Sequence, residues 1–132
     1  MKIDPMKRVL VLVFLLLFVL ICCHKEEEKY AQTLLRTLDS GKVLSTKNAM
    51  DRIAYSLNRY MMDNGKFPEG EDIGSITSAL CPAYTAELSS RDAWGNELHY
   101  DSGGGHFSLI ASGEDGTFDN EDDVVMIDGT YR

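Results

Sequence analysis

A change in the spacing of apolar residues along the chain constrains the fold most. Within residues 45–64 the apolar side chains recur every four residues, at Ala49, Ile53, Leu57 and Met61, and this is the spacing of one helix face. After residue 96 the spacing falls to two, which is typical of strands with one buried face. An amphipathic helix must bury its apolar face, and such strands offer a partner. The sequence therefore predicts an α+β domain in which a long amphipathic N-terminal helix packs on a small antiparallel sheet.

The long helical region is expected in two pieces. A first segment covers residues 26–40 and is interrupted by Gly41, because glycine is a poor helix former. The amphipathic helix then begins with a cap at Ser45 or Thr46. It ends at Asn64-Gly65, where glycine supplies the left-handed residue.

The rest of the domain is expected from shorter segments. In chain order these are a helix over residues 73–80, strands over residues 97–100, 106–111 and 124–127, and a hairpin loop over residues 101–105. The hairpin is expected to place His99 opposite His106, and two exposed histidines are too few ligands for zinc. Trp94 is expected to be a core residue beside a glycine turn. Cys81, the only cysteine of this part, is expected to be a small buried residue without a disulfide.

The amino-terminal part has the pattern of a targeting segment. Basic residues precede thirteen apolar residues, Val9–Ile21, which are followed by Cys22 and Cys23. A transmembrane helix needs about 20 apolar residues, whereas a signal-peptide core needs about 7–15. The pattern favours a bacterial lipoprotein signal with lipidation at Cys23, or less readily at Cys22; the alternative is an uncleaved helical anchor. The predicted organisation is a signal peptide or membrane anchor (residues 1–22), a tether with the first helical segment (residues 23–44) and a globular domain (residues 45–132).

The formal net charge of −8 and the missing motifs exclude several classes of function. Lysines and arginines are scattered among acidic neighbours, so no basic face for nucleic acid is expected. The sequence contains no Ser-His-Asp arrangement, phosphate-binding loop or dinucleotide fingerprint. Asp122 and Asp123 are adjacent, and adjacent residues of a strand point to opposite faces, so they do not form a hydrolytic pair. We expect a protein that contacts the membrane and other proteins, is not an enzyme and has no small-molecule substrate.

An acidic segment between Ser112 and Asp128 predicts a cation site. Its acids are Glu114, Asp115, Asp119, Glu121, Asp122, Asp123 and Asp128, and it contains no Lys or Arg. Like charges this close repel one another, and a hard divalent cation relieves the repulsion. Calcium fits best, because it accepts about six to eight oxygen ligands in loose geometry and the segment has no His or Cys for zinc or copper. A solvated acidic loop is the alternative, since the spacing does not match an EF-hand.

Three motifs follow one another in a characteristic order. They are Met-Asp-Asn-Gly-Lys-Phe-Pro at residues 62–68, Arg-Asp-Ala-Trp-Gly-Asn at residues 91–96, and the acidic segment from Ser112 to Val124. Together they resemble the major pseudopilin of bacterial type II secretion systems, over roughly residues 31–128. Ala93 stands where that family usually has Pro.

The resemblance implies a calcium site in the acidic segment. The implied ligands are the side chains of Asp115, Asp122 and Asp123 and the main-chain carbonyl of Ser112. Asp119 and Glu121 have no counterpart and are interpreted as outer-shell residues. The implied role of the ion is structural, because it would tie the loop to the last strand.

The amino terminus departs from the family pattern. Pseudopilins carry a Gly-terminated leader and a Glu in the apolar helix, whereas this chain has no such Gly and no acid between Arg8 and Ile21. We interpret the chain as a pseudopilin-like domain on a lipid or signal anchor in the bacterial envelope, facing the periplasm or the outer side. It is expected to act through protein contacts in a type II secretion or type IV pilus-like apparatus. The alternative is a calcium-stabilised surface lipoprotein for adhesion or sensing.

Overall fold

The computed structural model describes residues 5–132, without the side chains of residues 5 and 19–27. Cys22 and Cys23, the expected lipidation sites, therefore lie outside the described side chains. The chain divides into two compact units, residues 1–39 and 40–132. In the first unit, the described side chains of residues 6–18 are exposed. Within the described residues, no helix has an apolar stretch long enough to cross a membrane.

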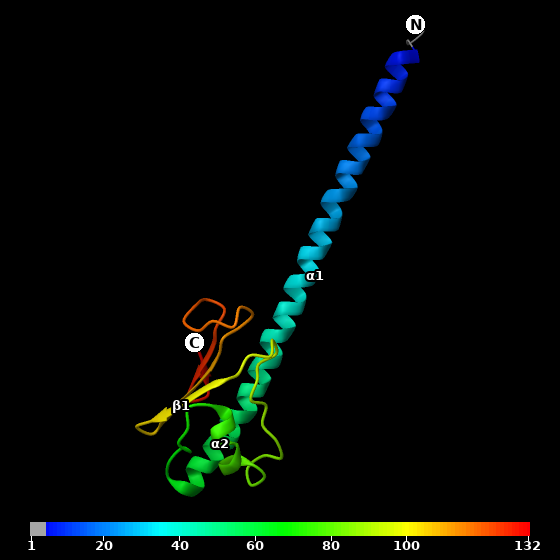
Figure 1. Ribbon diagram of the computed structural model, residues 1–132. Coiled ribbons are helices and arrows are strands. Elements are labelled where there is room, and N and C mark those ends of the chain that lie inside the picture. The colour runs from blue at the N-terminus through cyan, green and yellow to red at the C-terminus, as the bar shows by residue number, and fades with distance from the viewer. Residues whose placement is uncertain (1–4) are drawn as a thin grey trace. The chain divides into compact units, whose positions relative to one another are not determined.

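Helix α1 covers Pro5–Asn64 (Figure 1). The predicted interruption at Gly41 is wrong: this glycine is exposed, a Cβ atom there would meet nothing within 4 Å, and the helix runs through it. One glycine costs a helix only about 1 kcal/mol relative to alanine, which the neighbouring turns offset. The predicted cap is wrong for the same reason, since Ser45 and Thr46 lie inside α1. Gly65, with φ of +73°, follows the helix as expected.

The buried face of α1 in the second unit follows the predicted spacing. Met50, Ile53 and Leu57 are buried, while Tyr55 and Met62 on the opposite side are exposed. Burying such a side chain contributes roughly 1.5–3 kcal/mol relative to leaving it in water. This face therefore provides the helix side of the core.

Helix α2 covers Ile73–Leu80, as predicted. Asp72 caps it, because its Oδ1 accepts a hydrogen bond from the main-chain N–H of Ser75 over 2.7 Å. The apolar side chains Ile73, Ile76 and Leu80 are buried. The helix ends at Leu80, because the next residue, Cys81, has an extended backbone and precedes a proline. Cys81 is only half-buried, so the prediction of a buried cysteine is wrong.

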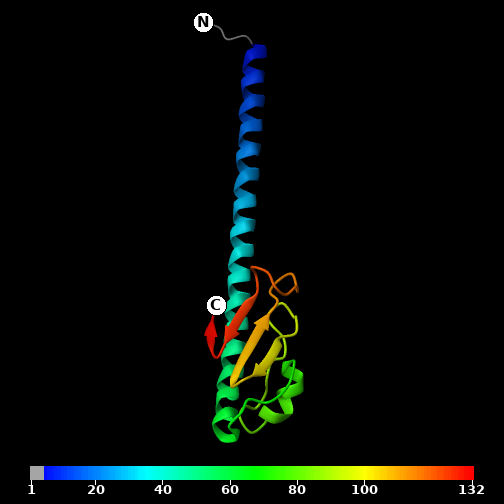
Figure 2. The ribbon, with the colours of Figure 1, turned by 90° about the vertical axis from the view of Figure 1, so that its left-hand side faces the viewer.

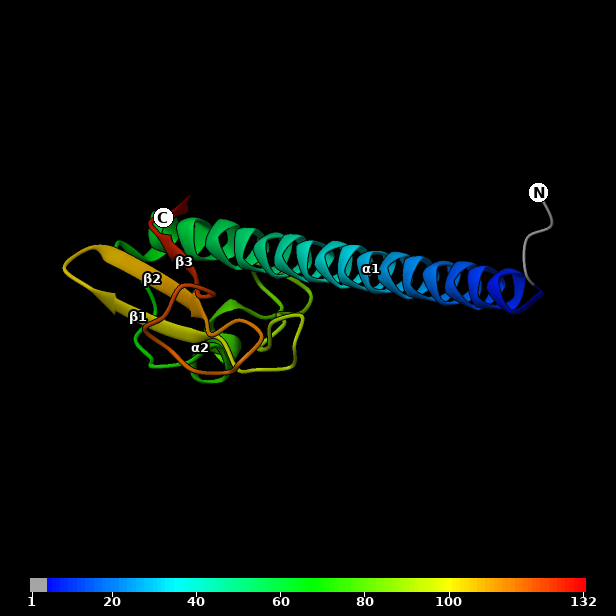
Figure 3. The ribbon, with the colours of Figure 1, turned by 90° about the horizontal axis from the view of Figure 1, so that it is seen from above.

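Four antiparallel strands form one sheet in the order β1-β2-β3-β4, and Figure 3 shows the first three side by side. They are β1 (His99–Gly103), β2 (His106–Ala111), β3 (Val124–Ile127) and β4 (Thr130–Tyr131). β2 and β3 have the predicted bounds. β1 differs from the prediction at both ends: it begins two residues later, at His99, and extends into the expected hairpin loop to Gly103. Gly104 and Gly105, both with positive φ, make the turn with only two residues.

The strand register corrects the expected pairing of the two histidines. His99 pairs with Ile110, and His106 pairs with Gly103, so the histidines do not face each other. The two-residue turn causes this shift, since a turn centred on residue 103 would have placed them nearly opposite. One row of paired residues crosses all four strands, namely Tyr100, Leu109, Met126 and Tyr131, and its first three members are fully buried.

Strand β4 was not expected from the sequence, and it lies beside α1 in Figure 2. The hydroxyl of Tyr131 lies 2.8 Å from the main-chain carbonyl of Lys47 and 2.9 Å from Asp51 Oδ1, and it donates to these acceptors. Lys47 Nζ lies 4.8 Å from the centre of the Tyr131 ring. These contacts attach the carboxyl-terminal strand to the long helix.

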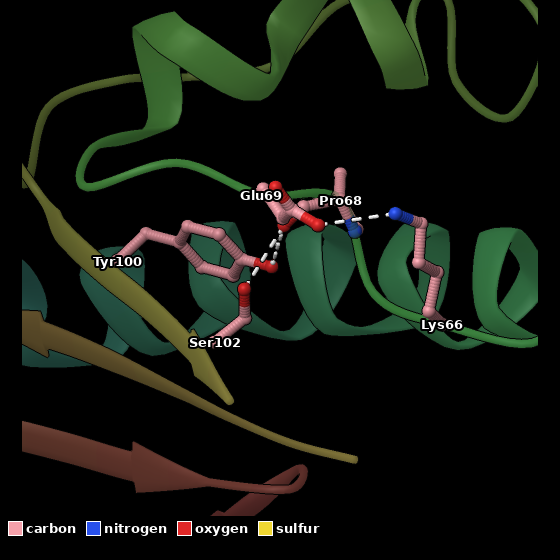
Figure 4. A network of polar contacts seen from close by, with 5 residues as sticks. All are labelled: Lys66, Pro68, Glu69, Tyr100 and Ser102. Carbon is pink, nitrogen blue, oxygen red and sulfur yellow. Dashed lines mark hydrogen bonds and ion pairs between the residues drawn. The ribbon is translucent and has the colours of Figure 1, made fainter. Parts of the chain in front are cut away.

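The segment that follows α1 is held on the hairpin (Figure 4). The carbonyl of Pro68 accepts hydrogen bonds from the hydroxyls of Tyr100 (2.7 Å) and Ser102 (3.0 Å). The rings of Phe67 and Phe107 meet edge to face, 5.0 Å between centres. Burial raises the pKa of the Tyr100 hydroxyl, so it stays a hydrogen-bond donor. The first of the three motifs therefore fixes the end of α1 against β1 and β2.

Candidate functional site

The acidic loop joins β2 to β3, and its two ends touch. Ser112 and Gly113 are buried at its start. Gly113 has φ of +68°, and a Cβ atom there would collide with the carboxylate of Asp122 and lie 2.5 Å from its carbonyl oxygen. Only glycine permits this approach. The loop therefore brings Gly113, the residue after the predicted carbonyl ligand Ser112, close to the predicted carboxylate ligand Asp122.

Asp115 is bound inside the loop. Its Oδ1 accepts from the main-chain N–H of Thr117 (2.7 Å) and its Oδ2 from the side-chain amide of Asn120 (2.9 Å). The main-chain N–H of Asp115 in turn donates to Oδ2 of Asp122 over 3.3 Å. Two of the predicted ligand residues are thus in direct contact.

Asp123 differs from the other two acids because one of its oxygens is buried and unpartnered. Its Oδ2 accepts from the main-chain N–H groups of Asp119 (2.8 Å) and Asn120 (3.4 Å). Its Oδ1 is buried and has no hydrogen-bond partner among the described residues. A buried carboxylate oxygen without a partner is costly, by roughly 1–3 kcal/mol or more. A cation is one partner that would remove this cost.

Asn120 is a loop residue whose role was not predicted from the sequence. Its side-chain amide donates to Asp115 and to the carbonyl of Thr117, and its Oδ1 accepts from the main-chain N–H of Asp122. The available signal was an asparagine within a run of acids, because asparagine commonly bonds to nearby main-chain groups in turns. Asp119, interpreted as an outer-shell residue, has φ of +71° and contributes its main-chain N–H.

The acids of the segment do not all belong to this arrangement. Glu114 and Glu121 are exposed. Asp128 lies beyond β3, where its carboxylate accepts from the main-chain N–H of Phe107 (2.9 Å) and lies 2.7 Å from His106 Nδ1. The hydrogen bond from Phe107, followed by that from His106, lowers the pKa of Asp128. This acid therefore joins β2 to the turn after β3.

The loop has features that fit an oxygen-ligated cation, but its carboxylates are engaged by loop amides. Among the described residues, no three His, Cys, Asp or Glu side chains are grouped so that they could hold a metal ion. Calcium also accepts main-chain carbonyl oxygens as ligands, in addition to side chains of these types. The unpartnered Oδ1 of Asp123 and the close approach at Gly113 are the features that fit the predicted ligand set.

Fold and loop together define a class of protein: a small α+β domain that follows a long amino-terminal helix and carries an acidic loop between its last long strands. Residues 33–129 match the family of type II secretion system protein G, and the chain belongs to this family. Searches among curated proteins and among solved structures gave no significant match.

Membership defines the protein's broad role. The family is a structural component of type II secretion and not a family of enzymes, so the chain is a pseudopilin-like, envelope-associated component of that process. The matched range covers the second unit up to the end of β3 and the acidic loop. Residues 1–32 and strand β4 lie outside it.

Proposed function

We propose that this chain is a non-enzymatic pseudopilin-like domain, anchored in the cell envelope, that acts by contacting other components of a type II secretion or type IV pilus-like apparatus. The family match over residues 33–129 carries this proposal. It is supported by the division of the chain, because residues 40–132 form a compact unit of their own.

Calcium stabilises the domain through the acidic loop. Its ligands are the side chains of Asp115, Asp122 and Asp123 and the main-chain carbonyl of Ser112. The unpartnered Asp123 oxygen and the contact between Asp115 and Asp122 support this set. Bound calcium would offset the negative charge of the carboxylates, and oxygens from both ends of the loop would coordinate it. Its binding energy would therefore add to the free energy of folding.

A lipid on Cys23, or less readily on Cys22, anchors the domain with its folded part on the periplasmic or outer side. The support is the sequence pattern of basic residues, thirteen apolar residues and the paired cysteines. Metabolic labelling with a lipid precursor tests the proposal. We expect Cys23→Ala to lose the label and the matched variant Cys81→Ala to retain it. Equal labelling of both variants, or no labelling of the wild type, would contradict lipidation at Cys23.

Deletion and complementation test the secretion role. We expect loss of the gene to reduce secretion by the cognate system, and the wild-type chain to restore it. Purification from detergent-solubilised membranes should recover other secretion components together with the chain. Leu57→Ala, which opens a cavity under α1, should restore secretion less well than the matched exposed variant Met62→Ala. Unchanged secretion after deletion, with no component recovered, would refute the proposal.

A further inference from the structure

The turn formed by residues 91–96 contacts both the acidic loop and helix α1. It is the second of the three sequence motifs, and neither the family match nor the ligand set assigns it a role. Each of its two contacts is a hydrogen bond between groups far apart in the chain, 17 and 47 residues respectively.

On the loop side, the contact is made by Asn96. Its side-chain amide donates to the main-chain carbonyl of Gly113 over 2.7 Å. Its Oδ1 lies close to the second loop glycine, since a Cβ atom on Gly116 would approach it to 3.2 Å. Asn96 therefore fixes the carbonyl of Gly113, one residue after the predicted ligand Ser112, where the loop leaves β2.

Within the turn, one oxygen of a buried carboxylate binds two main-chain N–H groups. Asp92 is 8% exposed, and its Oδ1 accepts from the main-chain N–H groups of Trp94 (2.9 Å) and Asn96 (2.8 Å). The main-chain N–H of Asp92 also donates to the carbonyl of Asn96 over 2.9 Å. A displacement of Asn96 is thus passed to the rest of the turn.

On the helix side, the contact is made by Thr46. Its hydroxyl, in a residue that is only 1% exposed, accepts from the main-chain N–H of Ala93 over 3.1 Å. One turn of α1 earlier, Lys42 Nζ lies 5.8 Å from the centre of the Trp94 ring. The mid-helix threonine, wrongly expected to be a cap, is the point at which the turn attaches to α1.

We propose that Asn96 is a positioning residue of the cation site and that the turn of residues 91–96 couples cation binding in the loop to helix α1 at Thr46. The inference rests on the calcium proposal above. Residues that orient metal ligands without touching the metal typically change metal affinity by about 10–100-fold when mutated. Coupling is reciprocal, so the bound cation also strengthens the contact between the turn and α1.

Isothermal titration calorimetry of calcium binding to the full-length chain in detergent tests the positioning role of Asn96. We expect Asn96→Ala to bind calcium at least about 10-fold more weakly than the wild type. The matched variant Asn58→Ala, exposed on α1, should bind like the wild type. Circular dichroism at the titration temperature verifies that each variant is folded. Asn96→Ala affinity within about twofold of wild type would overturn the positioning role, whereas no calcium binding by the wild type would overturn the calcium site itself.

Nuclear magnetic resonance of the wild-type chain tests the coupling without any variant. Addition of calcium chloride should shift the side-chain amide signal of Asn96 and the main-chain amide signals of Ala93 and Thr46. A turn that only supports the fold would not respond to the cation. Shifts confined to residues 112–123 would overturn the coupling.

Discussion

At the scale of single residues, aspartates in the second unit bind main-chain N–H groups at successive turns. Asp72 does so at the start of α2, Asp92 in the turn of residues 91–96, and Asp128 after β3. Asp115 and Asp123 do the same inside the acidic loop. Asp72, Asp92, Asp115 and Asp123 bind amides of their own turn or loop, which a short carboxylate reaches easily. Asp128 instead binds the main-chain N–H of Phe107 on β2. Part of the acidic composition therefore stabilises turns.

Asp123→Asn tests the role of the unpartnered oxygen. The variant keeps an oxygen that can accept from Asp119, but it loses the negative charge that would bind a cation. We expect it to lose most of the calcium-dependent increase in the free energy of unfolding, measured by urea denaturation with and without calcium. Asp63→Asn, an isosteric change on exposed α1, should keep the increase. An unchanged response of Asp123→Asn would remove this residue from the ligand set.

Tyr131→Phe tests the attachment of β4 to α1. The change removes the hydroxyl that donates to Lys47 and Asp51 and should lower the free energy of unfolding by about 1 kcal/mol. Burial, followed by Asp51, raises the pKa of Tyr131, so the wild type should also lose stability as the pH rises above about 10, where only the unfolded chain ionises. Tyr55→Phe, at an exposed position, serves as control. Equal urea midpoints for both variants would show that the bond contributes nothing.

Asp128→Asn tests the link between β2 and the turn after β3. The lowered pKa of Asp128 implies a stabilisation that is complete above the ordinary value of 3.8 and is lost as the pH falls through the folded-state value. Asparagine tolerates the left-handed backbone of this position, where φ is +51°. We expect the wild type to be more stable than the variant at pH 7, and the difference to shrink as the pH falls below 3.8, by urea denaturation. A difference that does not depend on pH would contradict this assignment.

At the scale of elements, the sequence predicted the helices and strands whose formation depends on residues that are neighbours in the chain. α2, β2 and β3 occur where apolar spacing and turn residues placed them, since their signals lie within a few positions. β4 has only two residues, and tertiary hydrogen bonds from Tyr131 hold it on α1, so its own sequence contained no sufficient signal. The same limit applies to Thr46, whose partner Ala93 lies 47 residues away.

A pair of glycine substitutions tests the continuity of α1. Gly41 lies inside the exposed helix, so Gly41→Ala should increase the free energy of unfolding by about 0.5–1 kcal/mol. A Cβ atom on Gly65 would likewise meet nothing within 4 Å, but the backbone there has a positive φ of +73°. Gly65→Ala should therefore decrease the free energy of unfolding by roughly 1–2 kcal/mol. Urea denaturation of the full-length chain measures both. If Gly41→Ala destabilised the protein, the helix would be interrupted there in solution.

At the scale of the whole molecule, the candidate site combines a part that the sequence predicted with a part that it did not. The acids were identifiable because they lie close together in the sequence and lack basic neighbours. Asn96 was not identifiable as part of the site, since only the folded chain places it against Gly113. The proposed calcium loop would therefore act on more than its own residues, because the turn of residues 91–96 connects it to α1.

Thermal unfolding of the full-length chain in detergent, in calcium and in chelator, tests the proposed calcium stabilisation most directly. At calcium concentrations of about 100 times Kd, binding adds roughly 2.7 kcal/mol, and this should raise Tm by on the order of 10 °C over the value in chelator. Magnesium should substitute poorly, since it requires stricter octahedral geometry. The same Tm in chelator and in calcium would contradict the account.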